Sequence, residues 1–318
     1  MYFDAEGVLK AHGYELMAKI GQGAYGRCYR IFSPKYNQTF VCKTIAQKSS
    51  FVHELNALMQ LDHPNIIKLY DYFLRDNIFF IILEDCVNGN ISEYMKKHKV
   101  TESQTVKWCY EIIDALNFIH KQGIVHLDIK PSNLLIDKYE RIKLADFGVA
   151  QPSEIKCENY VGTKYFMAPE LFSFEPYDTY AADVWSLGVT LYYVIYQQLP
   201  FKNEAQWEIF LERGFKEFPS EVCAELQQCM IRCIQKDPKR RATMSILKEI
   251  ITPKKEEVSQ KPKKPNILLS MMKSKQPFCN SMLNFNVSMR PTNMYCSNSE
   301  TRFNLGHKEL SKLPPLHA

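Results

Sequence analysis

The sequence feature that most constrains this chain is a pair of polar loops near its middle. The first, Val125–Asn133, reads VHLDIKPSN, and the second is Asp146-Phe147-Gly148. A strand-rich segment separates them, and its composition is typical of one short strand pair. Asn133 and Asp146 supply the hard oxygen ligands that Mg²⁺ prefers, so they are the candidate metal ligands.

Two more side chains of the first loop suit phosphoryl chemistry. Asp128 can orient a hydroxyl nucleophile and accept its proton. Lys130 can neutralise charge on a phosphoryl group during its transfer. Each residue type is common in surface loops when it stands alone. The full set in this order indicates a catalytic site, because every member has the local context that the chemistry requires.

A glycine cluster near the start, Gly21-Gln22-Gly23-Ala24-Tyr25-Gly26, matches the pattern GxGxxG. Alone, the pattern fits either a dinucleotide-binding fingerprint or a turn-rich loop. A strand follows it instead of a helix, which argues against the dinucleotide-binding fold. A flap between two strands suits a cover over phosphates, because glycines let backbone N–H groups approach closely. Gly21, Gly23 and Gly26 are therefore candidate phosphate-binding residues.

Lys43 lies on the next predicted strand, and Glu54 falls on an amphipathic helix eleven residues later. A strand lysine is usually a solvated surface charge. Paired with Glu54, however, the Lys43 ammonium would suit triphosphate oxygens.

The order of elements predicts an α+β fold in which a small strand lobe precedes a larger helical lobe, with a ligand cleft between them. Ser49 or Ser50 is expected to cap the helix that carries Glu54, and Asp62-His63-Pro64-Asn65 is expected to end it. The expected strands are Tyr14–Ile20, Gly26–Phe32, Thr39–Ile45, Ile66–Phe73 and Ile78–Glu84, and helices are expected from Ile91 onward, including Asp183–Gln197 and Cys223–Lys236.

The last part of the chain, 252–318, differs in composition. It is rich in Lys, Pro, Ser, Asn and Met and carries a net charge of +7, whereas the net charge of the whole chain is +5. Hydrophobic periodicity is absent from it, so we expect a basic, largely disordered tail.

The ten cysteines and the lack of a secretory signal predict reduced thiols and a cytoplasmic location, with the nucleus as an alternative. Cys223, Cys229 and Cys233 suggest a zinc site, but no CxxC pair or nearby His completes four ligands, which favours core packing. No apolar run approaches the roughly 18 residues that a membrane span needs. The excess of basic residues is also confined to the tail, so we expect neither a membrane nor a nucleic acid as partner.

At this point the chain resembles the eukaryotic protein kinase family, from Tyr14 to Ile251. The resemblance extends to three further motifs: Ala168-Pro169-Glu170, the run DVWSLG at 183–188, and the run DPKRR at 237–241. It implies a bilobal fold with an N-lobe at 14–84, a hinge at 85–90 and a C-lobe at 91–251. It also implies ATP and Mg²⁺ as cofactors and proteins as substrates.

The resemblance assigns further roles. Cys28 and Val41 would roof the adenine, Leu83 would be the gatekeeper, and the backbone of Glu84 and Cys86 would bind adenine. Leu135 is also expected at the nucleotide. In the large lobe, Glu170 and Arg241 would form a buried ion pair and Asp183 would brace the catalytic loop. A hydrophobic column that joins the lobes would consist of Leu58, Leu69, His126 and Phe147.

Lys130 together with Gly162-Thr163 resembles the serine/threonine branch. The stretch Tyr177–Phe201 is most similar to the calmodulin-dependent and AMP-activated kinase group. In that group a tail segment such as Asn266–Lys275 can bind calmodulin or inhibit the enzyme. A solvated tail without a partner is the alternative reading.

Several positions depart from the family. Leu127 stands where regulated kinases have an arginine that binds the activation-loop phosphate, and Asn159 stands where the phosphorylated threonine usually lies. These matched losses predict activity without that switch. The positions that read substrate arginine in basophilic kinases are Asn90, Ser132 and Tyr193, and none is acidic.

Two other readings remain open. A pseudokinase would keep the fold without the chemistry, although Lys43, Asp128, Asn133 and Asp146 are all present. A small-molecule kinase is disfavoured by Ala168-Pro169-Glu170 and by Thr163.

Overall fold

The computed structural model describes residues 4–23, 26–46, 48–153, 162–173, 175–215, 218 and 222–252. These residues belong to one compact unit, Met1–Thr252. Apart from Thr252, the predicted tail lies outside the described residues, as does Asn159.

The strand-rich beginning forms a five-stranded sheet in the order β1-β2-β3-β5-β4, with every neighbouring pair antiparallel. The helix α2 (Lys48–Gln60) lies between β3 and β4 in the chain. The predicted strand lobe is therefore confirmed. The strands are β1 (Glu15–Gly23), β2 (Gly26–Ser33), β3 (Gln38–Ile45), β4 (Leu69–Arg75) and β5 (Ile78–Glu84).

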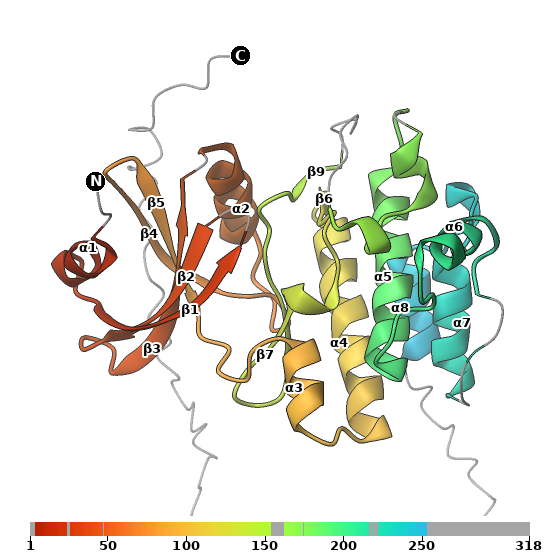
Figure 1. Ribbon diagram of the computed structural model, residues 1–318, viewed down its shortest axis with the longest axis horizontal. Helices are drawn as coiled ribbons and strands as arrows, with labels where there is room; N and C mark the ends of the chain where they lie inside the picture. The colour runs from red at the N-terminus through yellow and green to blue at the C-terminus, as the bar shows by residue number, and fades with distance from the viewer. Residues whose placement is uncertain are drawn as a thin grey trace, which may run out of the picture. The chain divides into compact units, whose positions relative to one another are not determined.

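The sheet has two different faces, because successive side chains of a strand alternate. Phe40 and Cys42 of β3 belong to the apolar cluster that also holds Leu9 of the helix α1 (Ala5–Ala11). Lys43 points the other way and bonds to Glu54 of α2. The helices α1 and α2 thus cover opposite faces of the sheet (Figure 1).

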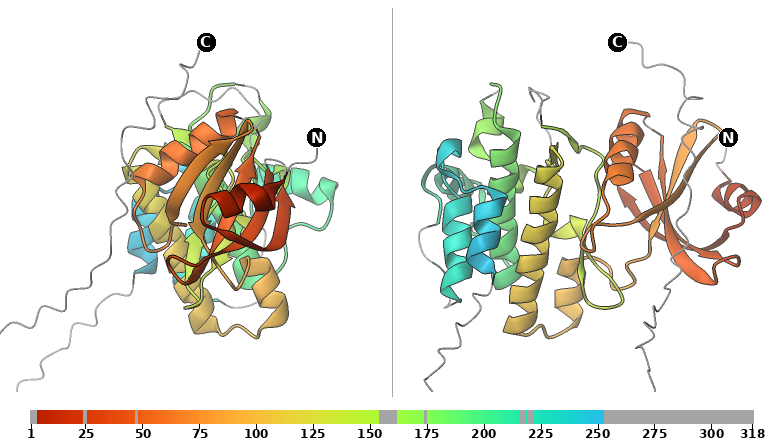
Figure 2. Two further views of the ribbon diagram at one scale, coloured as in Figure 1. Left: turned by 90° about the vertical axis from the view of Figure 1, so that its left-hand side faces the viewer. Right: turned by 180° about the vertical axis from the view of Figure 1, so that it is seen from behind.

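The rest of the described chain is mostly helical, as predicted (Figure 2). The long helix α5 is buried along most of its length, and α4, α7 and α8 pack together near it. Gly188 of α5 is needed for this packing, because an added Cβ would lie 2.6 Å from the Cβ of Cys233. The helices are α3 (Ile91–Lys97), α4 (Glu102–Lys121), α5 (Thr179–Tyr196), α6 (Glu204–Arg213), α7 (Ala224–Cys233) and α8 (Met244–Ile251).

Four short strands position the polar loops identified in the sequence. β7 (Leu134–Ile136) pairs with β8 (Ile142–Leu144), and this hairpin separates Asn133 from Asp146 as expected. β6 (Ile124–Val125) pairs with β9 (Gln151–Pro152). Each polar loop is therefore held at both ends by strand hydrogen bonds.

Some predicted element ends were wrong. Helix α2 begins at Lys48, so Ser49 and Ser50 lie inside it and not at the cap position. The burial of Phe51 and Leu55 fixes this helix more strongly than a local capping preference. Helix α5 begins at Thr179, capped by Asp178, four residues before the predicted start. The helix α1 was not predicted, because it presents too few apolar positions to show a period.

Cys229 and Cys233 are fully buried free thiols, which confirms core packing for both. Within the part of the chain that the structure describes, every helix is too short or too polar to span a bilayer.

Candidate active site

Three charged side chains from separate elements meet at the sheet. The Lys43 Nζ lies 2.7 Å from Glu54 Oε2 of α2 and 2.7 Å from Asp146 Oδ1. Glu54 also accepts through Oε1 at 2.9 Å. The predicted pairing of Lys43 with Glu54 is thus present, and Asp146 joins it.

Burial and attraction compete at this cluster. Burial lowers the pKa of Lys43, but the neighbouring carboxylates outweigh it and the net pKa is raised. Burial raises the pKa of Glu54, and the Lys43 ammonium offsets this only in part. Burial raises the pKa of Asp146, but attraction to the Lys43 ammonium outweighs it and leaves this pKa below its usual range. Lys43 therefore stays charged, and so does Asp146 at neutral pH.

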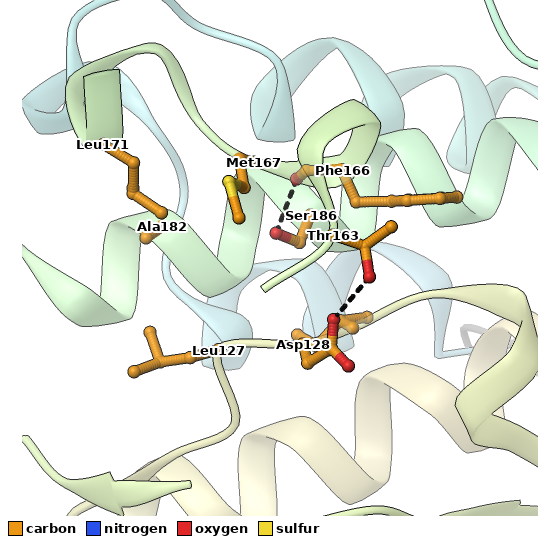
Figure 3. A pocket seen from close by; sticks show the side chains of 9 residues that line it. Leu127, Asp128, Thr163, Phe166, Met167, Leu171, Ala182 and Ser186 are labelled. Atoms are coloured by element: carbon orange, nitrogen blue, oxygen red, sulfur yellow. Dashed lines mark hydrogen bonds between the residues drawn. The ribbon is translucent and has the colours of Figure 1, made fainter. Parts of the chain in front are cut away.

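The catalytic-loop candidates form a second cluster around Asp128. Lys130 Nζ donates to Asp128 Oδ2 at 2.7 Å and to Thr163 Oγ1 at 2.8 Å. Thr163 in turn donates to Asp128 Oδ1 at 2.9 Å, and the two side chains face each other in Figure 3. Asn133 Nδ2 donates to the Asp128 carbonyl at 2.8 Å and to Oδ2 at 3.0 Å. Both bonds use the amide nitrogen, so the amide oxygen of Asn133 remains for a ligand.

Backbone contacts connect the two clusters. The Ala145 N–H donates to the Asn133 carbonyl at 2.9 Å, directly before Asp146. Asp146 has φ +64°, a left-handed conformation that non-glycine residues rarely adopt. Such strain is found where a fold fixes a functional side chain.

Asp183 braces the catalytic loop from helix α5, as expected. Its carboxylate accepts the backbone N–H groups of His126 and Leu127, each at 2.8 Å. It also contacts His120 Nε2 at 2.9 Å. Leu127 has φ +62°, so these bonds hold the loop in a strained turn.

His126 links the catalytic loop to the second polar loop. Its Nε2 lies 3.1 Å from the Ala145 carbonyl, and its Nδ1 accepts the Asp128 N–H at 3.3 Å. This pattern fits a neutral ring with the proton on Nε2, because a carbonyl can only accept. The His126 ring also meets Phe147 edge-on at 4.9 Å, so these two members of the predicted column are in contact.

The expected adenine-contacting side chains share one sheet face. Cys28 pairs directly with Lys43 across β2 and β3, and Val41 pairs directly with Leu83 across β3 and β5. Directly paired residues point to the same side, so all of them lie on the face that carries Lys43. Burial raises the pKa of Cys28, which makes it a poor nucleophile.

The flap glycines lie at the turn between β1 and β2. Gly21 pairs with Cys28, and Gly23 pairs with Gly26. Only glycine fits at position 26, because an added Cβ would lie 1.6 Å from the Thr44 carbonyl oxygen. This close approach accounts for one of the motif's glycines without reference to a ligand.

Ion pairs flank the predicted hinge, and sequence reasoning missed them. Lys143 Nζ lies 2.9 Å from Glu84 Oε2, and Arg30 Nε lies 3.0 Å from Asp85 Oδ2. Glu84 donates its N–H to the Lys68 carbonyl, and the Cys86 carbonyl accepts the Gly89 N–H.

The remaining candidate for nucleotide contact, Leu135, lies in β7 between two buried residues, with its own side chain only partly buried.

The predicted ion pair of the helical lobe is present. Arg241 Nη1 and Nη2 contact the two carboxylate oxygens of Glu170 at 2.5 and 2.8 Å. Arg241 also donates to the carbonyls of Ala181 and Gln235. The pair anchors the segment that follows Thr163 to helix α5.

Leu127 occupies apolar surroundings. With Val125 it forms a small cluster against Val149, Tyr177 and Tyr180. It also lines a small hollow beside Asp128 whose other walls include Met167, Leu171 and Ala182 (Figure 3).

Comparison with known sequences matches the profile of the protein kinase domain to residues 14–300. The chain belongs to the protein kinase domain family. The match extends past Ile251, where the resemblance in the sequence was expected to end.

Kinases from plants and animals are among the similar proteins. The 3-phosphoinositide-dependent protein kinase 1 of Arabidopsis thaliana is 31% identical over 256 residues, which cover 73% of this chain and 52% of the relative. Serine/threonine-protein kinase ULK3 of Homo sapiens is 30% identical over 250 residues, covering 72% and 52%. CBL-interacting serine/threonine-protein kinase 10 of Arabidopsis thaliana is 28% identical over 251 residues, covering 74% and 52%. The chain spans about half the length of these curated relatives.

Proposed function

We propose that this chain is a serine/threonine protein kinase, which transfers the γ-phosphoryl group of Mg-ATP to hydroxyl groups of proteins. The observation that carries this proposal is the pair of linked clusters, Lys43–Glu54–Asp146 and Lys130–Asp128–Thr163. One supplies a cation and a metal-binding carboxylate, and the other supplies a hydroxyl-positioning carboxylate.

The nucleotide would lie against the sheet face that carries Lys43. Cys28 and Val41 would cover the adenine, with Leu83 at its edge and Leu135 on the opposite side. The backbone of Glu84 and Cys86 would bind the adenine edge. Gly21, Gly23 and Gly26 would cover the phosphates, and Lys43, anchored by Glu54, would bind them.

Mg²⁺ fits the donor set of this site. Among the described residues, both hydrogen bonds of the Asn133 side chain use its nitrogen and leave its oxygen for a metal, and Asp146 stays ionised beside Lys43. When bound, the metal neutralises phosphate charge during transfer. Both proposed ligands are the hard oxygen atoms that Mg²⁺ prefers.

In the transfer step, Asp128 orients the substrate hydroxyl and accepts its proton. A bond forms between the hydroxyl oxygen and the γ-phosphorus, while the bond from that phosphorus to the bridging oxygen of ADP breaks. Lys130, which already contacts Asp128 and Thr163, stabilises the charge on the moving group.

The test is transfer of labelled γ-phosphate to a generic basic protein with Mg²⁺, beside Asp128→Asn. We expect transfer by the wild type and a loss of at least about a hundredfold in the mutant. ATP binding without transfer would favour the pseudokinase, and transfer only to small alcohols would favour a small-molecule kinase.

We also propose that activity does not depend on an activation-loop phosphate. Leu127 is buried among apolar side chains, where a phosphate-binding arginine would stand in regulated kinases. The Asp183 and Thr163 bonds hold the catalytic loop instead. Treatment of the purified chain with a broad phosphatase should leave its transfer rate unchanged, and a large loss would contradict this proposal.

The kinase group and the tail partner are proposed from similarity to the curated relatives. We propose membership of the calmodulin-dependent and AMP-activated kinase group, because CBL-interacting kinases recur among the relatives. Their names record an interaction with CBL, and by likeness we propose a partner such as calmodulin at the tail of this chain. The free thiols of the described cysteines support a cytoplasmic or nuclear location.

A further inference from the structure

Lys164 directly follows, in the chain, the cluster of Lys130, Asp128 and Thr163 that would position the substrate hydroxyl. It follows Thr163, whose hydroxyl bonds to both Asp128 and Lys130, and it begins the short helix Lys164–Phe166. A substrate hydroxyl must come within about 3 Å of Asp128 to react. The Cα atoms of the residues on either side of a reacting serine or threonine lie about 3.8 Å from its own Cα, so these residues pass close to Thr163 and to Lys164, the next residue in the chain.

Helix α6 and an aromatic group hold the Lys164 ammonium in place. Its Nζ pairs with Glu204 Oε1 and lies 4.8 Å from the centre of the Trp207 ring. Tyr165 packs edge-on against the same ring at 5.9 Å, and its hydroxyl contacts Glu204 Oε2 at 3.4 Å. The cation is thus directed by two neighbours from α6.

The pair remains open to solvent. The side chains of Lys164 and Glu204 are 47% and 48% exposed. An exposed ion pair is weak, so a carboxylate brought by a substrate can share or displace Glu204. A bound substrate holds its carboxylate at high effective concentration, so that carboxylate can compete with Glu204 for Lys164.

The other residues that could contact a substrate near its reacting hydroxyl do not attract a basic substrate residue. Asp128 is already bonded to Lys130, Thr163 and Asn133. The positions expected to attract substrate arginine, namely Asn90, Ser132 and Tyr193, are uncharged. Lys164 is then the charge nearest in the chain to Thr163.

We propose that Lys164 reads the substrate residue directly beside the accepting serine or threonine, and that it selects an acidic side chain there. The inference rests on the proposed kinase activity and names a preference within it. Glu204 acts as an internal competitor that keeps the preference modest.

The test measures kcat/KM on two series of serine peptides. One series carries Asp, Asn or Lys directly before the serine, and the other carries Asp, Asn or Lys directly after it. At one of these positions we expect the Asp peptide to exceed the Asn peptide roughly twofold to fivefold, with the Lys peptide slowest. Lys164→Gln should bring the Asp/Asn ratio to one, and Lys164→Arg should retain it. Glu204→Gln should raise the ratio, because it removes the competitor.

Lys10→Gln is the matched control, since Lys10 is an exposed lysine of α1 on the far face of the sheet. It should keep the wild-type ratio. Equal rates on the Asp and Asn peptides, or a ratio unchanged in Lys164→Gln, would overturn the role of Lys164 and leave the kinase proposal intact. Failure of the wild type on every peptide and on the generic protein would instead refute the kinase activity itself.

Discussion

Asp183 Oδ1 accepts a 2.8 Å hydrogen bond from the backbone N–H of Leu127, a residue held at φ +62°. The carboxylate of a buried helix therefore maintains a strained turn one residue before Asp128. Replacing the carboxylate by an amide places an NH₂ group against one of two backbone donors, so that donor loses its acceptor.

For Asp183→Asn we expect kcat to fall by about tenfold to a hundredfold, because Asp128 is displaced from its reactive position. The KM for ATP should change less than kcat, because Lys43 and Glu54 lie on β3 and α2, outside the loop that Asp183 braces. Steady-state kinetics measure both quantities. An unchanged kcat would show that the strained turn persists without this brace.

Replacing Lys43 should lower the free energy of unfolding more than replacing Glu54. Lys43→Met leaves the buried Glu54, whose side chain is 1% exposed, without a counter-ion. We expect it to lower the free energy of unfolding by about 3–5 kcal/mol and transfer by about a hundredfold or more. Glu54→Gln leaves Lys43 paired with Asp146 and should cost less stability. Urea unfolding of both variants measures the order, and the reverse order would contradict this account.

Replacing Arg241 should lower the free energy of unfolding more than replacing its partner Glu170. Arg241→Leu removes the partner of Glu170 and strands the carbonyls of Ala181 and Gln235. We expect a loss of about 3–5 kcal/mol. Glu170→Gln should cost only about 1–3 kcal/mol, because Arg241 keeps both carbonyls and one amide oxygen. Calorimetry on both variants tests this, and equal losses would show that the backbone contacts contribute little.

Asp137 should make stability depend on acidity. Burial raises its pKa, but bonds from Arg141 and from the backbone N–H of Arg141 and Tyr139 outweigh this and leave the pKa lowered. A lowered pKa stabilises the fold above the unfolded value, which is 3.8. That contribution is lost as pH falls below 3.8 toward the folded pKa.

Asp137→Asn should therefore reduce the free energy of unfolding by about 2–3 kcal/mol at pH 7 and equally at pH 5. The difference from the wild type should shrink at pH values below about 4. Urea titrations at these pH values provide the test. A difference that stayed constant under acid would mean that Asp137 is not ionised in the folded protein.

Members of the two candidate clusters could be picked out from the sequence because Lys43 and Glu54 lie within a recognisable strand and helix. Asp128, Lys130 and Asp146 lie in two polar loops beside short strands. Lys43 and Glu54 meet as predicted, whereas the contact of Lys43 with Asp146 was not predicted. The hinge pairs Arg30–Asp85 and Glu84–Lys143 could not be predicted. They depend on how separate elements lie against one another, which local spacing does not reveal.

The helix α1 also has a practical consequence. The match to the protein kinase domain family begins at residue 14, so a recombinant fragment could be started there. Such a fragment would lose Leu9, which is fully buried, and the stack of His12 on Phe73 at 3.7 Å. The outer side of the sheet, including Ile31 and Phe40, would then face water. Fragments that start at Tyr14 should self-associate, whereas those that retain Asp4 and the helix behind it should stay monodisperse.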